Sequence, residues 1–560
     1  MTVDEPVGCA AVSVDGGVIN VDAAPSEATG LSISSAPPVT THPGTLSWAV
    51  PAANRLGGGV EIFSDTCGGT MVAGYPITTD QNQLVLGPLA AGTYQWRVTG
   101  RGNGTCGDSL PPACQTFTVI PAGGFDARFG TGGAITDIDL GYAYGIGQQA
   151  DGRIVVMGQG SSGVDNDIGV VRLNADGSLD DGGASDTTPG DSYGTNGHAL
   201  VDFTNTGDAD NPIGLALQPD GRALVVEHSN SSPQWEVFRL TANGAFDTTF
   251  NSTGKATVTV GTSSSVPEGI ALRSDGRIVL GGHADRGLGS NVDLTLAQLN
   301  GDGTLDDGGA SDSTPLDSFG TSGLAAYASS SGNFIDHSAS TVIDKLGRIL
   351  SGGALNKQIA VVRWLAGGSL DTSFGTAGMA VFPVATSLDA GALTIAETND
   401  VKILVGGYGY IAGTGTVGVI LRLNADGSLD TTFSGDGELR ITLPIQAGIT
   451  QVYLAKLLQV GDKIIAVAQA LNEPWPCNSV NQAVDDVLVL VLNADGSPDS
   501  NFGNNGSARL TLGQDFSVYP YTADITPDGE LLIAGGYQGT LPSPTCRPAK
   551  GSWFVMRVRL

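Results

Sequence analysis

The chain has 560 residues, of which 83 are glycine, 41% are hydrophobic and only 15% are charged. This composition predicts frequent turns and largely buried strands, without long amphipathic helices. The formal net charge of -30 would repel phosphate groups, which excludes nucleic acid and anionic membrane surfaces as partners and leaves cations, basic proteins and neutral glycans.

No apolar run approaches the roughly 20 residues that a membrane-spanning helix needs, so we expect no membrane insertion. Met1 to Gly8 is acidic, unlike the basic start of a signal peptide, so either a leader was removed or the gene product begins elsewhere. The six cysteines are even in number, which indicates disulfides and a secreted, cell-surface or periplasmic location. The alternative is six free thiols in a cytosolic protein.

The repeat that dominates the chain is absent before about residue 121. We expect an N-terminal segment over 1–30 and a small β-sandwich over 31–121, with strands near 45–50 and 60–63. The segment Leu-Gly-Pro-Leu-Ala-Ala-Gly-Thr-Tyr that ends at Tyr94 resembles the fibronectin type III family. The resemblance implies that Tyr94 is a tyrosine-corner residue and that this domain is a spacer or adhesion module.

Four cysteines lie in this first part of the chain. Cys106 and Cys114 flank a short segment between two expected strands, so we expect a disulfide that closes a hairpin there. By elimination, Cys9 and Cys67 would then pair, although four cysteines allow three connectivities.

From Phe125 to Leu560 one phrase recurs seven times, most plainly as Leu-Asn-Ala-Asp-Gly-Ser-Leu-Asp-Thr-Thr-Phe between Leu423 and Phe433. Each copy of roughly 60 residues holds four strand-sized segments, a period typical of a ring of β-blades. Asp-Gly pairs between apolar runs predict a hairpin in each copy. We therefore predict an all-β fold in which residues 125–560 form a seven-bladed β-propeller with four-stranded blades.

The two ends of the repeat region are complementary. It begins with a fourth-type strand, Gly133–Ile138, and the chain stops at Leu560 after a third-type strand. Because an open ring would leave two unpaired sheet edges, we predict that these two segments pair and close it.

The repeated Leu-Asp-x-x-Phe-Gly phrase, followed by a Gly-Arg-Ile-Val-like strand, resembles the delta-60 repeat family, whose members look like β-propellers. The resemblance spans about 125 to 560. It implies a fold and little chemistry.

The phrase itself suggests calcium, because Asn424, Asp426 and Asp430 offer oxygen ligands at spacings used by calcium loops of some propellers. Calcium loops place another acidic residue two positions before the Asn, where this chain has Arg422. We favour the alternative that the Asp-Gly turn and the later aspartate only hold the loop in place.

Two copies carry insertions that each cluster four aspartates, whose repulsion a bound cation would relieve. These are the candidate metal ligands for calcium, the one cofactor we expect, and a solvated acidic loop is the alternative. The candidate ligands are Asp180, Asp181, Asp186 and Asp191 in the first loop, and Asp306, Asp307, Asp312 and Asp317 in the second.

A polar rim is expected at the mouth of the channel. Six residues after the hairpin Arg or its equivalent, five of the seven copies carry a side chain that can hydrogen-bond: Gln159, His228, His283, Tyr408 and Gln469. His228 and His283 suggest a metal pair, but the nearest further ligand, Glu227, should point to the opposite face of its strand. We therefore favour a rim that binds a glycan or peptide.

The longest loops are expected on the same face, after Leu471 and between Tyr537 and Trp553. Cys477 and Cys546 lie in equivalent loops of adjacent blades, where a disulfide would stiffen that edge. Trp475 would stack on a sugar or a partner side chain, with burial in its own loop as the alternative.

No specific catalytic motif is found in the sequence. The favoured function is an extracellular or cell-surface scaffold that binds a glycan or protein on the long-loop face without turnover. One alternative is a polysaccharide-acting lyase or hydrolase that uses the rim. The other is a structural subunit that self-associates into a fibre or coat.

Overall fold

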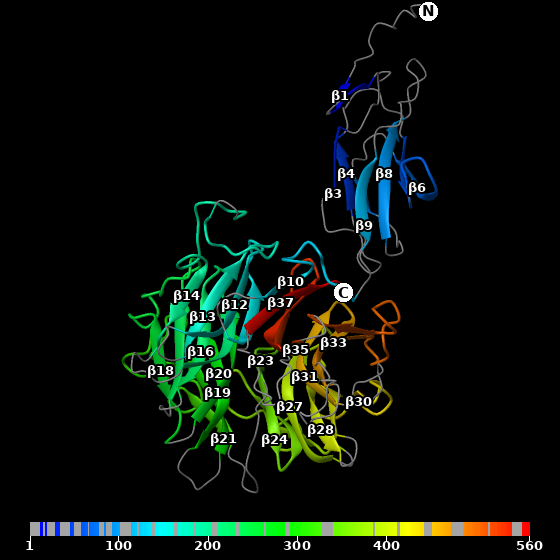
Figure 1. Cartoon of the computed structure of the whole chain (residues 1–560). Coiled ribbons are helices and arrows are strands. Elements are labelled where there is room, and N and C mark those ends of the chain that lie inside the picture. Colours follow the sequence, from blue (N-terminus) through cyan, green and yellow to red (C-terminus); the bar gives the residue numbers. More distant parts are fainter. Residues whose placement is uncertain are drawn as a thin grey trace, which may run out of the picture. The chain divides into compact units, whose positions relative to one another are not determined.

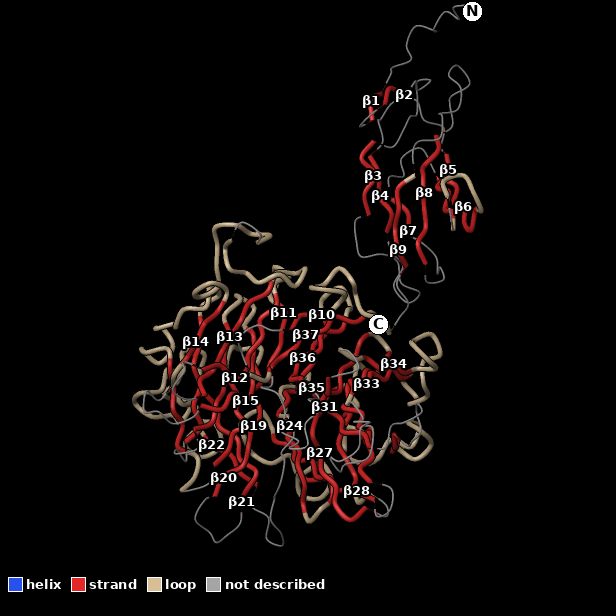
Figure 2. The backbone as a smooth tube through the Cα atoms, in the orientation of Figure 1, coloured by secondary structure: helices blue, strands red, loops and turns tan. Residues whose placement is uncertain are grey.

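The structure is a computed structural model of the chain. It describes residues 12–14, 17–19, 29–33, 45–49, 58–64, 66–77, 83–85, 92–100, 114–119, 123–136, 141–161, 166–183, 186–203, 210–229, 234–262, 265–285, 292–327, 340–384, 387–411, 415–441, 451–471, 485–512, 516–539 and 552–560. Within these ranges every regular element is a strand, and no helix is long and apolar enough to cross a membrane. Figure 1 and Figure 2 show this all-β architecture.

The chain divides into two compact units. Unit 1 comprises Met1–Gly124 with Asn501–Gly503 and Arg559–Leu560, and unit 2 comprises Phe125–Ser500 with Asn504–Val558.

Unit 1 contains one four-stranded sheet and two smaller ones among its described residues. The four-stranded sheet has the order β6 (Met71–Ile77), β5 (Gly58–Phe63), β8 (Gly92–Gly100), β9 (Gln115–Val119). The smaller sheets are β3 (Thr29–Ile33), β4 (Thr45–Ala49), β7 (Gln83–Val85), and the pair β1 (Val12–Val14), β2 (Gly17–Ile19). Val60, Ile62 and Trp96 are fully buried, and Tyr94, the expected corner residue, is buried in β8.

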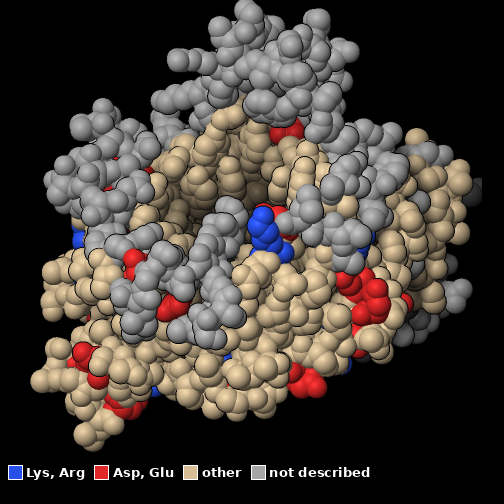
Figure 3. Space-filling view, turned by 90° about the horizontal axis from the view of Figure 1, so that it is seen from below, with Lys and Arg blue, Asp and Glu red and all other residues tan. Residues whose placement is uncertain are grey.

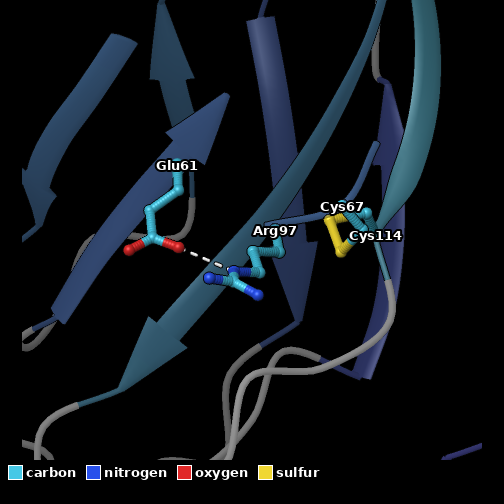
Figure 4. Close-up of a disulfide and its surroundings, with 4 residues drawn as sticks. All are labelled: Glu61, Cys67, Arg97 and Cys114. Atoms are coloured by element: carbon cyan, nitrogen blue, oxygen red, sulfur yellow. Dashed lines mark hydrogen bonds and ion pairs between the residues drawn. A yellow bond between two sulfur atoms is a disulfide. The ribbon is translucent and has the colours of Figure 1, made fainter. Parts of the chain in front are cut away.

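The disulfide of unit 1 differs from the predicted pairing. Cys67 is bonded to Cys114, close to the ion pair of Arg97 Nε with Glu61 Oε2 at 2.6 Å (Figure 4). The predicted pairs Cys106–Cys114 and Cys9–Cys67 are therefore wrong. The bond joins positions 47 residues apart in the sequence, and proximity along the chain is no guide to such a pairing. Cys9, Cys106, Cys477 and Cys546 lie outside the described residues.

Unit 2 is built from four-stranded antiparallel sheets, which we number in chain order. Sheet 1 is β11 (Ala143–Gln148), β12 (Ile154–Ser161), β13 (Asn166–Leu173), β14 (His198–Val201). Sheet 2 is β15 (Asp210–Leu217), β16 (Ala223–Ser229), β17 (Gln234–Leu240), β18 (Lys255–Thr259). Sheet 3 is β19 (Ser265–Leu272), β20 (Ile278–Asp285), β21 (Val292–Leu299), β22 (Leu324–Tyr327). Sheet 4 is β23 (Thr341–Ile343), β24 (Ile349–Leu355), β25 (Gln358–Trp364), β26 (Met379–Phe382).

Sheet 5 is β27 (Ser387–Glu397), β28 (Ile403–Ile411), β29 (Gly415–Leu423), β30 (Glu438–Ile441). Sheet 6 is β31 (Gln451–Val460), β32 (Lys463–Leu471), β33 (Asp486–Leu492), β34 (Ser507–Leu510). Sheet 7 is β35 (Phe516–Ile525), β36 (Leu531–Gly539), β37 (Ser552–Val558), with β10 (Ala134–Thr136) as its last strand. With the sheet of unit 1, the described residues thus form eight four-stranded sheets.

The first strands contact one another in chain order, from β11 to β15 and onward to β31 and β35. The last of them, β35, contacts β11, so that the series of sheets returns to its beginning. On the other edge of sheet 7, β10 pairs antiparallel with β37, with Ile135 opposite Val555 (Figure 1). This is the terminal pairing predicted from the sequence, and it gives β37 a partner on each side.

The cores lie between consecutive sheets. In β16, Ala223 and Val225 pack with the residues of sheet 1, whereas Leu224 and Val226 pack with those of sheet 3. Because successive side chains of a strand point to opposite faces, a strand between two neighbours must be apolar on both. This explains the nearly continuous apolar runs of the repeats.

Candidate functional site

The repeated phrase forms an ion pair under an aromatic ring. In sheet 5, Arg422 Nε donates to Asp430 Oδ2 at 2.8 Å, and the guanidinium carbon lies 5.0 Å from the centre of the Phe433 ring. Arg422 Nη1 also donates to the carbonyl of Ala494, in the turn that follows β33 of sheet 6. The phrase therefore connects neighbouring sheets.

The same arrangement recurs around unit 2 with two substitutions. Arginine pairs with the aspartate of the phrase as Arg172–Asp180, Arg239–Asp247, Arg363–Asp371, Arg422–Asp430 and Arg557–Asp126. In sheet 3 the arginine is replaced by Gln298, which donates to Asp306, and Arg273 reaches the carbonyl of Ala366 at 2.8 Å instead. In sheet 6 the ammonium of Lys463 lies 3.1 Å from Asp499.

The inserted loops hold their aspartates with protein donors. In the first loop, Asp186 accepts hydrogen bonds from the main-chain nitrogens of Gly182 (2.7 Å) and Thr188 (2.8 Å) and from the Asn174 amide (2.8 Å). Although burial opposes them, these bonds lower the pKa of Asp186 to about 2.

The other aspartates of that loop are also bonded. Asp180 pairs with Arg172, Asp191 with Arg153 at 2.8 Å, and Asp181 accepts from the Gly183 nitrogen at 2.7 Å.

The second loop repeats this pattern. Asp312 accepts from the Gly308 nitrogen (2.6 Å), the Thr314 nitrogen (2.8 Å) and the Asn300 amide (2.6 Å). Asp317 pairs with Arg277, Asp307 accepts from the Gly309 nitrogen at 2.7 Å, and Asp306 accepts from Gln298. Neither loop brings three of its carboxylates within 4.8 Å of one another in the described structure, so calcium here stays a prediction.

The predicted rim residues occupy equivalent places near the ends of the second strands. Gln159, His228, His283, Tyr408 and Gln469 are all half-buried. The Glu268 carboxylate lies 2.9 Å from His283 Nδ1, an acidic partner that sequence reasoning missed. Burial lowers the pKa of His228, the charge of Glu236 opposes this, and His283 adds a smaller lowering effect. Trp475 lies outside the described residues.

A cavity of about 670 Å³ is lined by residues of all seven first strands of unit 2. The wall is therefore formed by the first strands of the sheets, whereas the predicted rim residues lie on the second strands. The rim residues are absent from it, although His283 reaches it through Glu268. The face seen from below in Figure 3 is hollowed near its middle, and atoms of lysine or arginine residues (blue) are visible beside the hollow.

The cavity wall combines aromatic and charged side chains. The rings of Tyr144 and Tyr521 have centres 5.0 Å apart, and the Tyr142 ring lies edge-on to Tyr521 at 5.9 Å. Lys456 and Asp524 also line the wall. Burial lowers the pKa of Lys456 while the charge of Asp524 opposes this, and burial raises the pKa of Asp524.

Sequence reasoning missed these lining residues because they lie on first strands, which were interpreted as apolar core. Polar residues within those apolar runs, such as Lys456 in β31 and Asp524 in β35, are the sequence signal that could have indicated the cavity wall.

Comparison with known proteins matches four segments of unit 2 to a family model. Residues 149–182, 218–250, 273–308 and 399–433 match the family model described as "Domain of unknown function (DUF5122) beta-propeller". No curated protein matches the chain.

Three solved structures illustrate the structural similarity. A polysaccharide lyase is 9% identical, with 76% of this chain and 99% of that chain covered and a TM-score of 0.41. The extracellular domain of a putative hybrid two-component system from B. thetaiotaomicron is 10% identical, with 96% and 54% covered and a TM-score of 0.35. The β-propeller domain of the Trilobed protease from Pyrococcus furiosus is 9% identical, with 74% and 93% covered and a TM-score of 0.35. The matched repeats support a β-propeller family for unit 2.

Proposed function

We propose that the protein is an extracellular binding scaffold whose unit 2 is a seven-bladed β-propeller of the delta-60 type. Its ligand is a glycan or a polypeptide segment that enters the cavity on the ring axis. The N-terminal unit, a fibronectin type III-like sandwich in this proposal, serves as the spacer. The Cys67–Cys114 disulfide supports an oxidising compartment.

The cavity of about 670 Å³ is the observation that carries this proposal. Its volume lies in the range typical of small-ligand sites. The adjacent rings of Tyr144 and Tyr521 offer an apolar surface for a sugar ring or a side chain, and Lys456 with Asp524 offers a donor and an acceptor to orient it.

Screening of the full chain against glycan and peptide arrays tests the proposal, with calorimetry on each ligand found. Tyr521→Ala and Lys456→Met should each weaken binding. Tyr410→Ala is the matched control, since Tyr410 is 45% exposed and is not part of the cavity wall. Equal affinity of all four proteins would disprove the assignment to the cavity.

A second candidate function is a lyase or hydrolase that acts on polysaccharides. It is favoured by the contact of His283 Nδ1 with Glu268 at 2.9 Å, because Glu268 lines the cavity and the pair can exchange a proton. Turnover of a bound polysaccharide that is abolished in Glu268→Gln while binding persists would establish this function.

A further inference from the structure

Three aspartates that no sequence motif connects lie together between sheets 1 and 2. Asp167 is in β13, Asp202 follows β14, and Asp210 begins β15. One carboxylate oxygen from each lies within 4.8 Å of the other two. Oxygens that ligate one Ca²⁺ at about 2.3–2.6 Å are separated by such distances.

Asp167 and Asp210 are buried, and one carboxylate oxygen of Asp210 has no hydrogen-bond donor among the described residues. Asp167 is 1% exposed and Asp210 is 0% exposed. Asp210 Oδ2 accepts a hydrogen bond from the Phe203 nitrogen at 2.7 Å, but no described residue donates to Asp210 Oδ1. A buried carboxylate oxygen without a donor or cation is costly, so this atom needs a partner.

Two glutamates extend the acidic group from the side of sheet 2. Glu227 and Glu236 are directly opposite each other on β16 and β17. Glu227 is 0% exposed, and its carboxyl group is close to the Asn211 main chain and to the Glu236 carboxyl group. Burial first, and then the neighbouring carboxyl group of Glu236, raise the pKa of Glu227 to about 10.

Strand alternation shows where these glutamates point. Glu227 lies on the same face of β16 as Ala223 and Val225, which pack against sheet 1. Glu227 therefore points toward sheet 1, and the charge of Asp210 contributes to its raised pKa. The Glu227 carboxyl group thus faces the space between sheets 1 and 2, where Asp210 lies.

The equivalent place in sheet 6 shows how the protein neutralises such an aspartate elsewhere. Asp486 occupies the position in β33 that Asp167 occupies in β13, and Arg509 of the adjacent strand β34 forms an ion pair with it. Leu200 stands at the position of Arg509 in β14. The nearby ammonium of Lys255 donates to the main-chain carbonyls of Asp202 (3.2 Å) and Phe203 (2.8 Å).

We propose that Asp167, Asp202 and Asp210 bind one hard divalent cation, of the Ca²⁺ or Mg²⁺ class, between sheets 1 and 2. The donor set consists of oxygens alone, which such cations prefer over softer transition metals. Glu227 and Glu236 lie beside this group and offer further ligand oxygens. The site is separate from the inserted loops and does not depend on the ligand of the cavity.

Metal analysis of the full chain tests the site. The protein is treated with EDTA, dialysed, and titrated by calorimetry with CaCl₂ and separately with MgCl₂, while the bound metal is measured by mass spectrometry. We expect Asp210→Asn and Asp202→Asn each to lose one cation per chain relative to wild type. Asp436→Asn, the matched control at an exposed aspartate outside this group and outside both inserted loops, should keep it. Whichever salt binds more tightly identifies the cation.

Circular dichroism of each variant checks the fold, and Asp202→Asn provides the test if Asp210→Asn does not fold, since Asp202 is only half-buried. The proposal is overturned if wild type binds neither cation at millimolar concentration. It is also overturned if both folded variants bind as much cation as wild type. The carboxylates would then be a group that shares protons, with Glu227 in its neutral form.

Discussion

Arg422 and Asp430 form a buried ion pair, 2.8 Å between Nε and Oδ2, and both residues belong to the same repeat. Its importance extends beyond that repeat, because the guanidinium also donates to the Ala494 carbonyl of the neighbouring sheet. An arginine in the place expected of a calcium ligand thus joins two sheets through hydrogen bonds.

Asp430→Asn should destabilise the fold by about 3–5 kcal/mol, because it leaves the buried Arg422 charge without its carboxylate. The double variant Arg422→Met, Asp430→Leu should lose less, since it leaves no unpaired buried charge and the other partner of Asp430, Lys402, is partly exposed. Urea unfolding of the full chain measures both. Asp436→Asn changes an exposed aspartate and serves as control. An unchanged midpoint in Asp430→Asn would show that the pair is not needed.

Acid should unfold the protein partly through this aspartate. Burial opposes ionisation of Asp430, but hydrogen bonds from Thr432 and the charges of Lys402 and Arg422 lower its pKa to about 2. A depressed pKa stabilises the folded state fully above the ordinary value of about 3.9, and this stabilisation is lost as pH falls toward the folded value. The urea midpoint should therefore fall between about pH 4 and pH 2, and less steeply in Asp430→Asn. Parallel pH profiles of the two proteins would contradict this.

Pairing of β10 with β37 should be needed for stability. Ile135 lies opposite Val555 and packs against the core between sheets 1 and 7, so Ile135→Asp places a charge against apolar side chains. We expect a lower melting temperature and self-association through the freed edge of β37, measured by light scattering. Thr136→Asp is the matched control, because Thr136 is exposed on the same strand. Identical behaviour of the two variants would argue against the pairing.

Val401 is a strained residue in a hairpin turn. It has φ +64°, where other hairpins have glycine, such as Gly152 with φ +90°. Val401→Gly should stabilise the fold by about 1 kcal/mol, since a left-handed conformation is costly for a residue with a Cβ atom. Val401→Ala, which keeps the Cβ, should gain less. Thermal unfolding measures the difference, and a lower melting temperature of Val401→Gly would refute it.

Peptide mapping under non-reducing conditions should recover a fragment that links Cys67 to Cys114. Cys67→Ser should destabilise unit 1 by about 2–4 kcal/mol, because the bond restricts the unfolded chain. Recovery of a Cys106–Cys114 fragment instead would contradict the structure.

Local signals in the sequence determined much of the fold. An Asp-Gly pair between apolar runs specifies a hairpin through the backbone conformations that glycine allows, and the strand missing from the last repeat indicated the pairing of β10 with β37. Arg422 argued against a calcium loop by its position alone, because a cation there repels the ion that an acidic residue would bind.

Only the tertiary structure decided which residues meet. Asp167, Asp202 and Asp210 come from strands of two sheets, and the cavity is lined by seven strands spread over most of unit 2. Cys67 and Cys114 are 47 residues apart. The physical reason is that strand and turn preferences act over a few neighbouring residues, whereas a site or a disulfide depends on how whole sheets pack.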